Sequence, residues 1–198
     1  MTPSRAVATL AVFAIVLSGC AATPPGAHSS AVPNPVTPTV PAPTPTPSVD
    51  PATITNLGPD SAGPIELGMT KDEVAATGAV TGISGTEGTC GQPSDGRLVG
   101  ALPADDSDLV GQLFFSTSTG KLVIIAATPT LATPEGIHLG SRLVDVKKAY
   151  PSWKGDEGGD QGAGLVKVDG NNQAVYRVYV DAGQVLELSL QQRRQDCS

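Results

Sequence analysis

Few side chains in this 198-residue sequence could do chemistry: it has three cysteines and two histidines. A thiol can be acylated, can pair in a disulfide or can act as a nucleophile, and an imidazole can move a proton. His28 lies in a proline-rich stretch, and His138 matches Glu66 of an internal repeat, so neither position demands a histidine. The chain contains no GxSxG, Walker, HExxH or CxxC motif. We therefore expect no catalytic residue and no cofactor, and a protein that is not an enzyme.

The acidic residues suggest solvated loops rather than a metal site. Asp156, Glu157 and Asp160 could offer oxygen ligands to calcium, but the stretch lacks the alternating ligands and closing glutamate of an EF-hand loop. The net charge is −7, and no run of Lys or Arg exceeds two residues. Nucleic acid and anionic lipid head groups are therefore poor candidates for partners.

The first residues have the pattern of an export signal. Residues 6–17 are a twelve-residue apolar run, shorter than the ~20 residues that a spanning helix needs. Leu17-Ser18-Gly19-Cys20 follows and resembles the lipobox of bacterial lipoproteins. The resemblance implies that residues 1–19 are a signal peptide and that Cys20 carries fatty acyl chains such as palmitate. These chains would hold the mature protein in the membrane, at its extracytoplasmic face. The alternative is an ordinary signal peptide whose cysteine has no role.

The next segment has the composition of a spacer. Residues 21–52 contain ten prolines and almost no charge. Proline lacks a backbone donor and fixes φ, so neither helix nor sheet is expected there. A disordered linker over residues 20–52, starting at the lipidated cysteine, would hold a folded domain of residues 53–198 clear of the membrane.

Two cysteines then remain, Cys90 and Cys197. An even number of cysteines in an exported domain predicts a disulfide, which would tie the middle of the chain to its last residues. Two free thiols are the alternative.

The sequence elements from which we expect the folded domain to be built occur twice. Residues 63–78 and 135–150 share a short extended piece, a glycine turn and an amphipathic helix, expected near 71–77 and 142–149. Thr70 and Glu73 have the spacing of a capping box. In the second copy Arg142 stands in place of Thr70, so Ser141 would have to cap.

A second repeated segment follows each helix, because residues 119–125 match residues 182–188. In each segment a glycine in a turn is followed by a strand with alternating side chains. The sequence therefore predicts an α+β domain made of two tandem helix-plus-antiparallel-sheet repeats, about 60–128 and 132–192. The two repeats would share one sheet, with both helices on one face.

Alternation along the predicted strands sorts side chains into two faces. We expect Val123 and Leu186 on the core side. The opposite side is the candidate binding face, composed of Phe114, Leu122, Ile124, Arg177, Tyr179, Val185 and Glu187. Such a mixture of aromatic, aliphatic and charged side chains is typical of a surface that binds another protein. The alternatives are an ordinary half-polar outer face, or a face that the linker covers.

The sequence Ile-x-Leu-Gly-Met-Thr-x-x-Glu-Val at residues 65–74 resembles the opening of SmpA/BamE-type small lipoprotein domains, and the duplication resembles β-lactamase inhibitory protein. The similarity covers residues ~60–192. It is closest to the tandem-repeat lipoproteins of high-GC Gram-positive bacteria. The resemblance implies a helical layer on one face of an antiparallel sheet and a second face left free, which the inhibitors use to grip an enzyme.

The leading hypothesis is a non-catalytic, lipid-anchored envelope protein that binds another exported protein through the open face of its sheet. One alternative is an inhibitor of a secreted hydrolase such as a β-lactamase, and another is an envelope enzyme.

Overall fold

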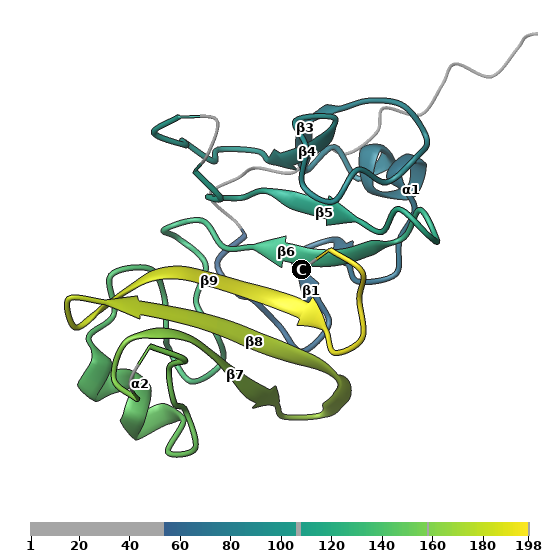
Figure 1. Cartoon of the computed structure of the whole chain (residues 1–198). Coiled ribbons are helices and arrows are strands. Elements are labelled where there is room, and N and C mark those ends of the chain that lie inside the picture. The colour runs from purple at the N-terminus through teal and green to yellow at the C-terminus, as the bar shows by residue number, and fades with distance from the viewer. Residues whose placement is uncertain (1–53, 106–107, 158, 198) are drawn as a thin grey trace, which may run out of the picture. The chain divides into compact units, whose positions relative to one another are not determined.

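A computed structural model of the chain describes residues 54–105, 108–157 and 159–197 (Figure 1). The predicted signal peptide, the predicted lipidation site Cys20 and the proline-rich linker lie outside these residues. Within the described ranges, no helix combines the length and the hydropathy that crossing a membrane requires.

The described chain forms short helices and a larger antiparallel sheet. The helices are α1 (Lys71–Ala76) and α2 (Leu143–Ala149). The strands are β1 (Ser61–Ala62), β2 (Ile65–Glu66), β3 (Val80–Ile83), β4 (Asp95–Leu98), β5 (Leu113–Phe115), β6 (Leu122–Ala126), β7 (Gly162–Val168), β8 (Asn171–Asp181) and β9 (Gln184–Gln192). The main sheet has five strands in the order β5-β6-β9-β8-β7, and β1-β2 and β3-β4 are separate two-stranded sheets.

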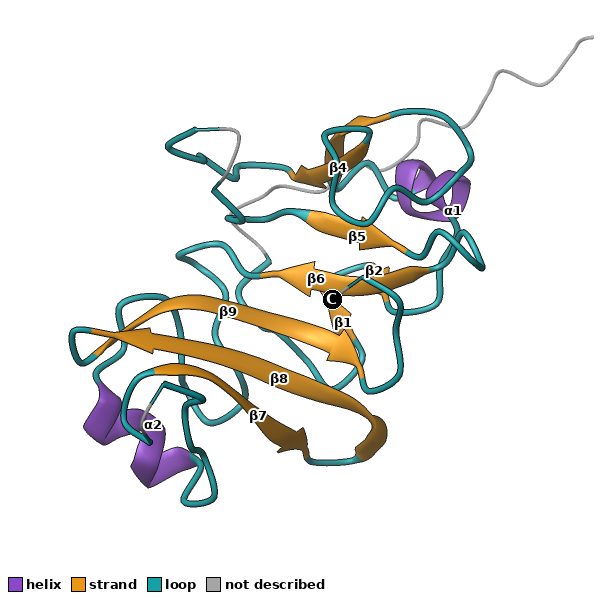
Figure 2. Ribbon diagram, in the orientation of Figure 1, coloured by secondary structure: helices purple, strands orange, loops and turns teal. Residues whose placement is uncertain are grey.

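The predicted fold class is wrong, because the two halves are not equivalent helix-plus-sheet repeats. The first half gives the main sheet only β5 and β6, whereas the second half gives it β7, β8 and β9. The helices have 6 and 7 residues, too short to form a layer over the sheet. Figure 2 shows α1 near β5 and α2 near β7, at opposite edges of the sheet. The described part of the chain therefore contains far more strand than helix, with its helices at the margins of the sheet.

The two helix starts differ in how their backbone donors are satisfied. The predicted capping box of α1 is confirmed, since the Thr70 hydroxyl accepts a hydrogen bond from the Glu73 N–H and the Glu73 carboxylate accepts one from the Thr70 N–H. The expected cap of α2 by Ser141 is wrong. The Ser141 hydroxyl instead accepts a hydrogen bond from the His138 N–H, and Arg142 occupies the cap position without a side-chain bond.

The core lies between one face of the main sheet and the first described segment of the chain. The Tyr176 hydroxyl reaches across it and lies 2.9 Å from the carbonyl oxygens of both Leu57 and Gly58. Trp153 is also buried, and its indole N–H donates to the Val178 carbonyl at 3.2 Å. In Figure 1 the segment carrying β1 and β2 passes behind the main sheet. The opposite face of the sheet, toward the viewer, carries the candidate site.

Candidate binding groove

Strand pairing determines which side chains point away from the core. Phe114 lies opposite Ile124, and Tyr179 lies opposite Glu187. These four residues and Arg177 stand outside the hydrophobic core cluster, on the outer face of the sheet. Five of the seven residues predicted for the binding face are therefore gathered on one surface: Phe114, Ile124, Arg177, Tyr179 and Glu187.

The other two residues of the predicted face are in the core. Irregularities in the register lie between Phe114 and Phe115 and between Tyr179 and Val180, so Phe115 pairs with Leu122 and Val180 pairs with Val185. A bulge reverses the facing of residues beyond it. As a result Leu122 is 0% exposed and Val185 is 1% exposed, whereas Leu186, expected in the core, is 52% exposed on the outer face.

The outer face is hollowed into an open groove of about 620 Å³. Its lining joins strands β5, β6, β8 and β9 to the loop before β5 and to the C-terminal segment. Besides the five predicted residues, the lining includes Asp108, Leu109, Val110, Ala126, Ala127, Leu139, Leu186, Leu188, Ser189, Gln191, Gln195 and Cys197. We call this surface the outer groove. It combines aliphatic and aromatic side chains with a few polar ones.

An ion pair crosses the outer groove between neighbouring strands. The Arg177 guanidinium of β8 donates to the Glu187 carboxylate of β9 at 2.5 Å. Both side chains are about one-third exposed, so solvent screens the attraction and its net contribution to stability is small. The pair mainly fixes where the two charges stand in the groove.

Tyr179 lies in a negative environment. Its cross-strand neighbours are Ala163 on β7 and Glu187 on β9. The carboxylate of Glu157, followed by burial and the carboxylates of Asp181, Glu187 and Asp156, raises the pKa of the Tyr179 phenol. The ring is half-buried and the hydroxyl stays protonated at neutral pH.

The ring of Phe114 lies close against the backbone of Gly91. Gly91 has φ +85°, and a Cβ placed there would lie 2.3 Å from Cε1 of the ring. Only glycine leaves this space and adopts this backbone conformation without strain. The loop that contains Gly91 therefore holds the aromatic ring at the edge of the outer groove.

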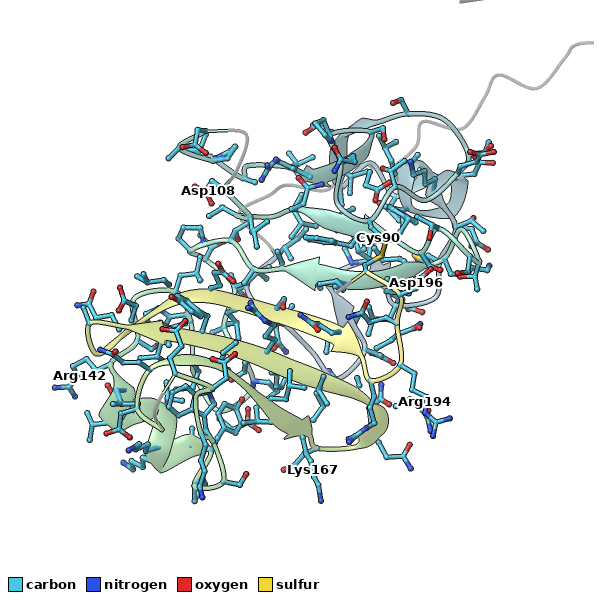
Figure 3. The ribbon with its side chains drawn as sticks, in the orientation of Figure 1. Cys90, Asp108, Arg142, Lys167, Arg194 and Asp196 are labelled. Carbon is cyan, nitrogen blue, oxygen red and sulfur yellow. A yellow bond between two sulfur atoms is a disulfide. The ribbon has the colours of Figure 1, made fainter. Side chains whose placement is uncertain are left out.

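The C-terminal segment forms one wall of the outer groove. The predicted disulfide is confirmed: Cys90 and Cys197, 107 positions apart in the sequence, are bonded, and their Cα atoms are 5.0 Å apart. The Asp196 carboxylate accepts hydrogen bonds from the Ser118 hydroxyl at 2.6 Å and the Ser118 N–H at 3.0 Å. These bonds hold the pKa of Asp196 well below its usual value. Figure 3 shows Cys90 and Asp196 close together, whereas Asp108 lies toward the start of β5.

Beneath this wall lies an ion pair that sequence reasoning missed. Lys71 Nζ is 2.9 Å from Asp95 Oδ1, and the two side chains are 2% and 0% exposed. The same carboxylate accepts hydrogen bonds from the N–H groups of Gly91 at 2.8 Å and Phe115 at 3.0 Å, and from the Thr89 hydroxyl at 2.8 Å. Asp95 thus joins α1, the disulfide loop and β5.

Burial raises the pKa of the Asp95 carboxyl, but the hydrogen bonds from Phe115, Gly91, Lys71 and Thr89 outweigh burial, and the pKa is lowered overall. The carboxylate is charged at neutral pH. The Lys71 ammonium is satisfied in turn, because it donates to the carbonyls of Ser84 and Ser94, both at 3.1 Å, and stands 5.6 Å from the centroid of the Phe115 ring.

The residues considered for other chemistry have structural partners. His138 is exposed, and its Nδ1 lies 2.7 Å from the Leu139 carbonyl. Asp156 accepts a hydrogen bond from the Ala163 N–H at 2.7 Å, and Asp160 pairs with Lys147. Among the described residues, the one trio of potential metal ligands within 4.8 Å is Cys90, Asp196 and Cys197. Its sulfurs are joined in the disulfide and are not the thiolates that bind metals.

Comparison with known proteins returned no relative. No protein-family model, no curated protein and no solved structure matches the chain. The arrangement of side chains in the outer groove must therefore support any functional conclusion by itself.

Proposed function

We propose that this protein is a non-catalytic, lipid-anchored envelope protein whose outer groove binds a segment of another exported protein. The observation that supports this most strongly is the open groove of about 620 Å³ on the sheet face opposite the core. Apolar lining with a few polar groups at set positions is typical of a binding surface rather than of a solvated sheet face.

The composition of the groove supports docking of a side chain rather than loose contact. Phe114 and Tyr179 are half-buried, and Leu186, which also lines the groove, is 52% exposed. Large side chains that are exposed in the free protein and would be covered in a complex are the usual anchors of protein interfaces. Leu109, at the start of the groove, is 38% exposed and extends the same apolar surface.

The surroundings of the groove favour a rigid receptor. Its floor is formed by hydrogen-bonded strands, and its C-terminal wall is fixed by the Cys90–Cys197 disulfide. A receptor that is ordered before binding loses less entropy when its partner docks. A rigid groove is therefore consistent with a site that binds a segment of another protein.

The location follows from the N-terminal sequence. Cys20 in the Leu17–Cys20 pattern would carry the acyl chains, and residues 21–52 would separate the outer groove from the membrane surface. Two or more acyl chains anchor a protein stably, whereas one gives only marginal binding. A partner exported to the same side of the membrane would then meet the groove.

The experiment that tests the proposal is photo-crosslinking in the native cell. A photoreactive amino acid is introduced in the full-length protein at Leu186, in the groove, or at Val144, which is 60% exposed on α2 and outside the groove lining. We expect a specific crosslinked exported protein from position 186 and none from position 144. Equal crosslinking from both positions, or none from either, contradicts the proposal. A crosslinked hydrolase would favour the alternative that the protein is an inhibitor.

A further inference from the structure

The carboxylates near the outer groove come from several elements that the sequence does not join. On β8 Tyr179 lies between Ala163 of β7 and Glu187 of β9. The backbone of Ala163 bonds in both directions with Asp156, whose N–H donates to the Ala163 carbonyl and whose carboxylate accepts from the Ala163 N–H. Glu157 follows Asp156 and is exposed, as is Asp181. Carboxylates near Tyr179 thus come from β9 (Glu187), from the end of β8 (Asp181) and from the loop before β7 (Asp156 and Glu157).

A further carboxylate belongs to the lining itself. Asp108 lines the groove beside Leu109, and its carboxylate accepts hydrogen bonds from the N–H groups of Ala104 at 2.8 Å and Val110 at 2.9 Å. These bonds fix the position of the carboxylate but do not neutralise its negative charge. Asp108 thus places a carboxylate in the loop before β5, where the Arg97 guanidinium, which donates to the Asp108 carbonyl at 2.6 Å and the Val110 carbonyl at 2.9 Å, partly offsets its charge.

The positive charge in the lining is already paired. Arg177 is the cationic residue of the lining, and its guanidinium bonds to Glu187. Glu157 and Asp181 then remain as exposed negative charges beside the groove. Residues 53–198 as a whole hold 11 basic and 18 acidic residues, so the long-range field has the same sign. The raised pKa of the Tyr179 phenol is consistent with this negative field.

We infer that the outer groove selects a cationic segment: an extended stretch of the partner that places an apolar side chain against Phe114, Ile124 and Leu186 and a Lys or Arg over Tyr179. The ring face attracts a cation, and the carboxylates of Glu157 and Asp181 strengthen that attraction. The inference rests on the proposed function and specifies the chemistry of the partner. A neutral segment would gain only the apolar contact, and an acidic segment would be repelled.

The test uses the full-length acylated protein in nanodiscs of neutral phosphatidylcholine, with empty nanodiscs as the reference. The probes are three short blocked peptides with the same leucine and glycine residues and with lysine, glutamine or glutamate at the remaining positions. Dissociation constants are measured by biolayer interferometry at low and at high salt. We expect the lysine peptide to bind about tenfold more tightly than the glutamine peptide at low salt and the glutamate peptide to bind most weakly. High salt should shrink the differences.

Two double variants assign the effect to the groove. Glu157→Gln with Asp181→Asn removes two charges near Tyr179, whereas Glu66→Gln with Asp72→Asn removes two exposed charges outside the groove lining. Both lose the same net charge. We expect the first pair to lower the preference for lysine several-fold, the second to change it less than twofold, and both to leave binding of the glutamine peptide unchanged.

The inference is overturned if the lysine and glutamine peptides bind equally, if none of the peptides binds, or if the two double variants behave alike. These failures are distinct from failure of the proposed function. If crosslinking from position 186 still captures an exported partner, the groove remains a docking site and only the cationic preference is wrong.

Discussion

Lys71 and Asp95 are joined by an ion pair of 2.9 Å in which neither side chain is more than 2% exposed. The pair connects the first residue of α1 with the first residue of β4, and the carboxylate also holds the loop that carries Cys90 and Gly91. The wall of the outer groove and the position of the Phe114 ring therefore depend on a charge that lies outside the groove.

The Asp95→Asn variant should be strongly destabilised. Removing one partner leaves the Lys71 ammonium buried without its counter-charge, which typically costs about 3–5 kcal/mol. The measurement is the free energy of unfolding from urea titrations at pH 7. Asp72→Asn, at an exposed neighbouring position on α1, is the control and should change the stability by less than about 0.5 kcal/mol. Similar values for the two variants would show that the buried pair is not important for stability.

The contribution of Asp95 should depend on pH in one direction. Its pKa is lowered in the folded state, so the unfolded chain takes up a proton at Asp95 at a higher pH than the folded chain does. The stability that Asp95 contributes is therefore fully present above its pKa in the unfolded chain, about 3.9, and is lost as the pH falls through its lower pKa in the folded protein. We expect the difference in unfolding free energy between wild type and Asp95→Asn to shrink below about pH 4. Because the other carboxylates are common to both proteins, a difference that stays constant from pH 7 to pH 3 would contradict the assignment.

Loss of the disulfide should lower the stability and loosen the wall of the groove. In the chain-entropy model, closing a loop of about 100 residues contributes at most about 4.7 kcal/mol. Cys197→Ser should therefore lower the unfolding free energy by several kcal/mol, and dithiothreitol should lower that of the wild type to a similar value. Dithiothreitol should not affect the variant, because no bond remains to be reduced. A wild type that is insensitive to the reductant after complete reduction would contradict the structural role of the bond.

The two helix starts predict different responses to truncation. Thr70→Ala removes the capping box of α1 and should cost about 1 kcal/mol. Arg142→Ala removes only an exposed ion pair with Asp145 and should cost less than about 0.5 kcal/mol. Urea titrations of both variants measure these values. Equal losses would show that the Thr70 hydroxyl is not the group that stabilises the start of α1.

Cys20 should decide where the protein is found in the cell. Cys20→Ala removes the thiol that would be acylated, so the protein should move from the membrane fraction to the soluble or secreted fraction. The measurement is fractionation of native cells followed by immunoblotting, with Cys90→Ser as the control that keeps Cys20. Equal retention of Cys20→Ala and wild type in the membrane fraction would rule out the lipid anchor.

The sequence predicted local structure better than it predicted the arrangement of the halves. Helices expected near 71–77 and 142–149 are observed at Lys71–Ala76 and Leu143–Ala149. The likeness between the halves is also real at the helix starts, since Thr70 bridges Lys121 and Arg142 bridges Gln184 in the same way. The likeness is weaker beyond that point. β4 pairs with β3 along its length and meets the chain before β5 only through the single bridge between Arg97 and Gln112, so it is not a third strand of the main sheet. Such pairing over long distances in sequence has no local signal.

The errors in the predicted binding face have a physical cause in the strands themselves. All five residues of β6 are apolar and buried, so its sequence has no alternation that could fix which side Leu122 takes. Val185 and Leu186 are adjacent and both apolar, and a bulge decides which of them faces the core. The burial of Lys71 was equally hidden, because a lysine in the first turn of a helix is normally solvated and its partner Asp95 comes 24 residues later.

The most direct test of the central claim measures how the aromatic anchors affect crosslinking in the native cell. Phe114→Ala and Tyr179→Ala are combined in the protein with the photoreactive residue at position 186, and Leu165→Ala, at a residue 63% exposed outside the groove lining, is the matched control. Circular dichroism verifies that both proteins fold. We predict that the double variant loses the crosslinked partner while the control keeps it. An equal yield of that partner from a folded double variant would contradict docking in the outer groove.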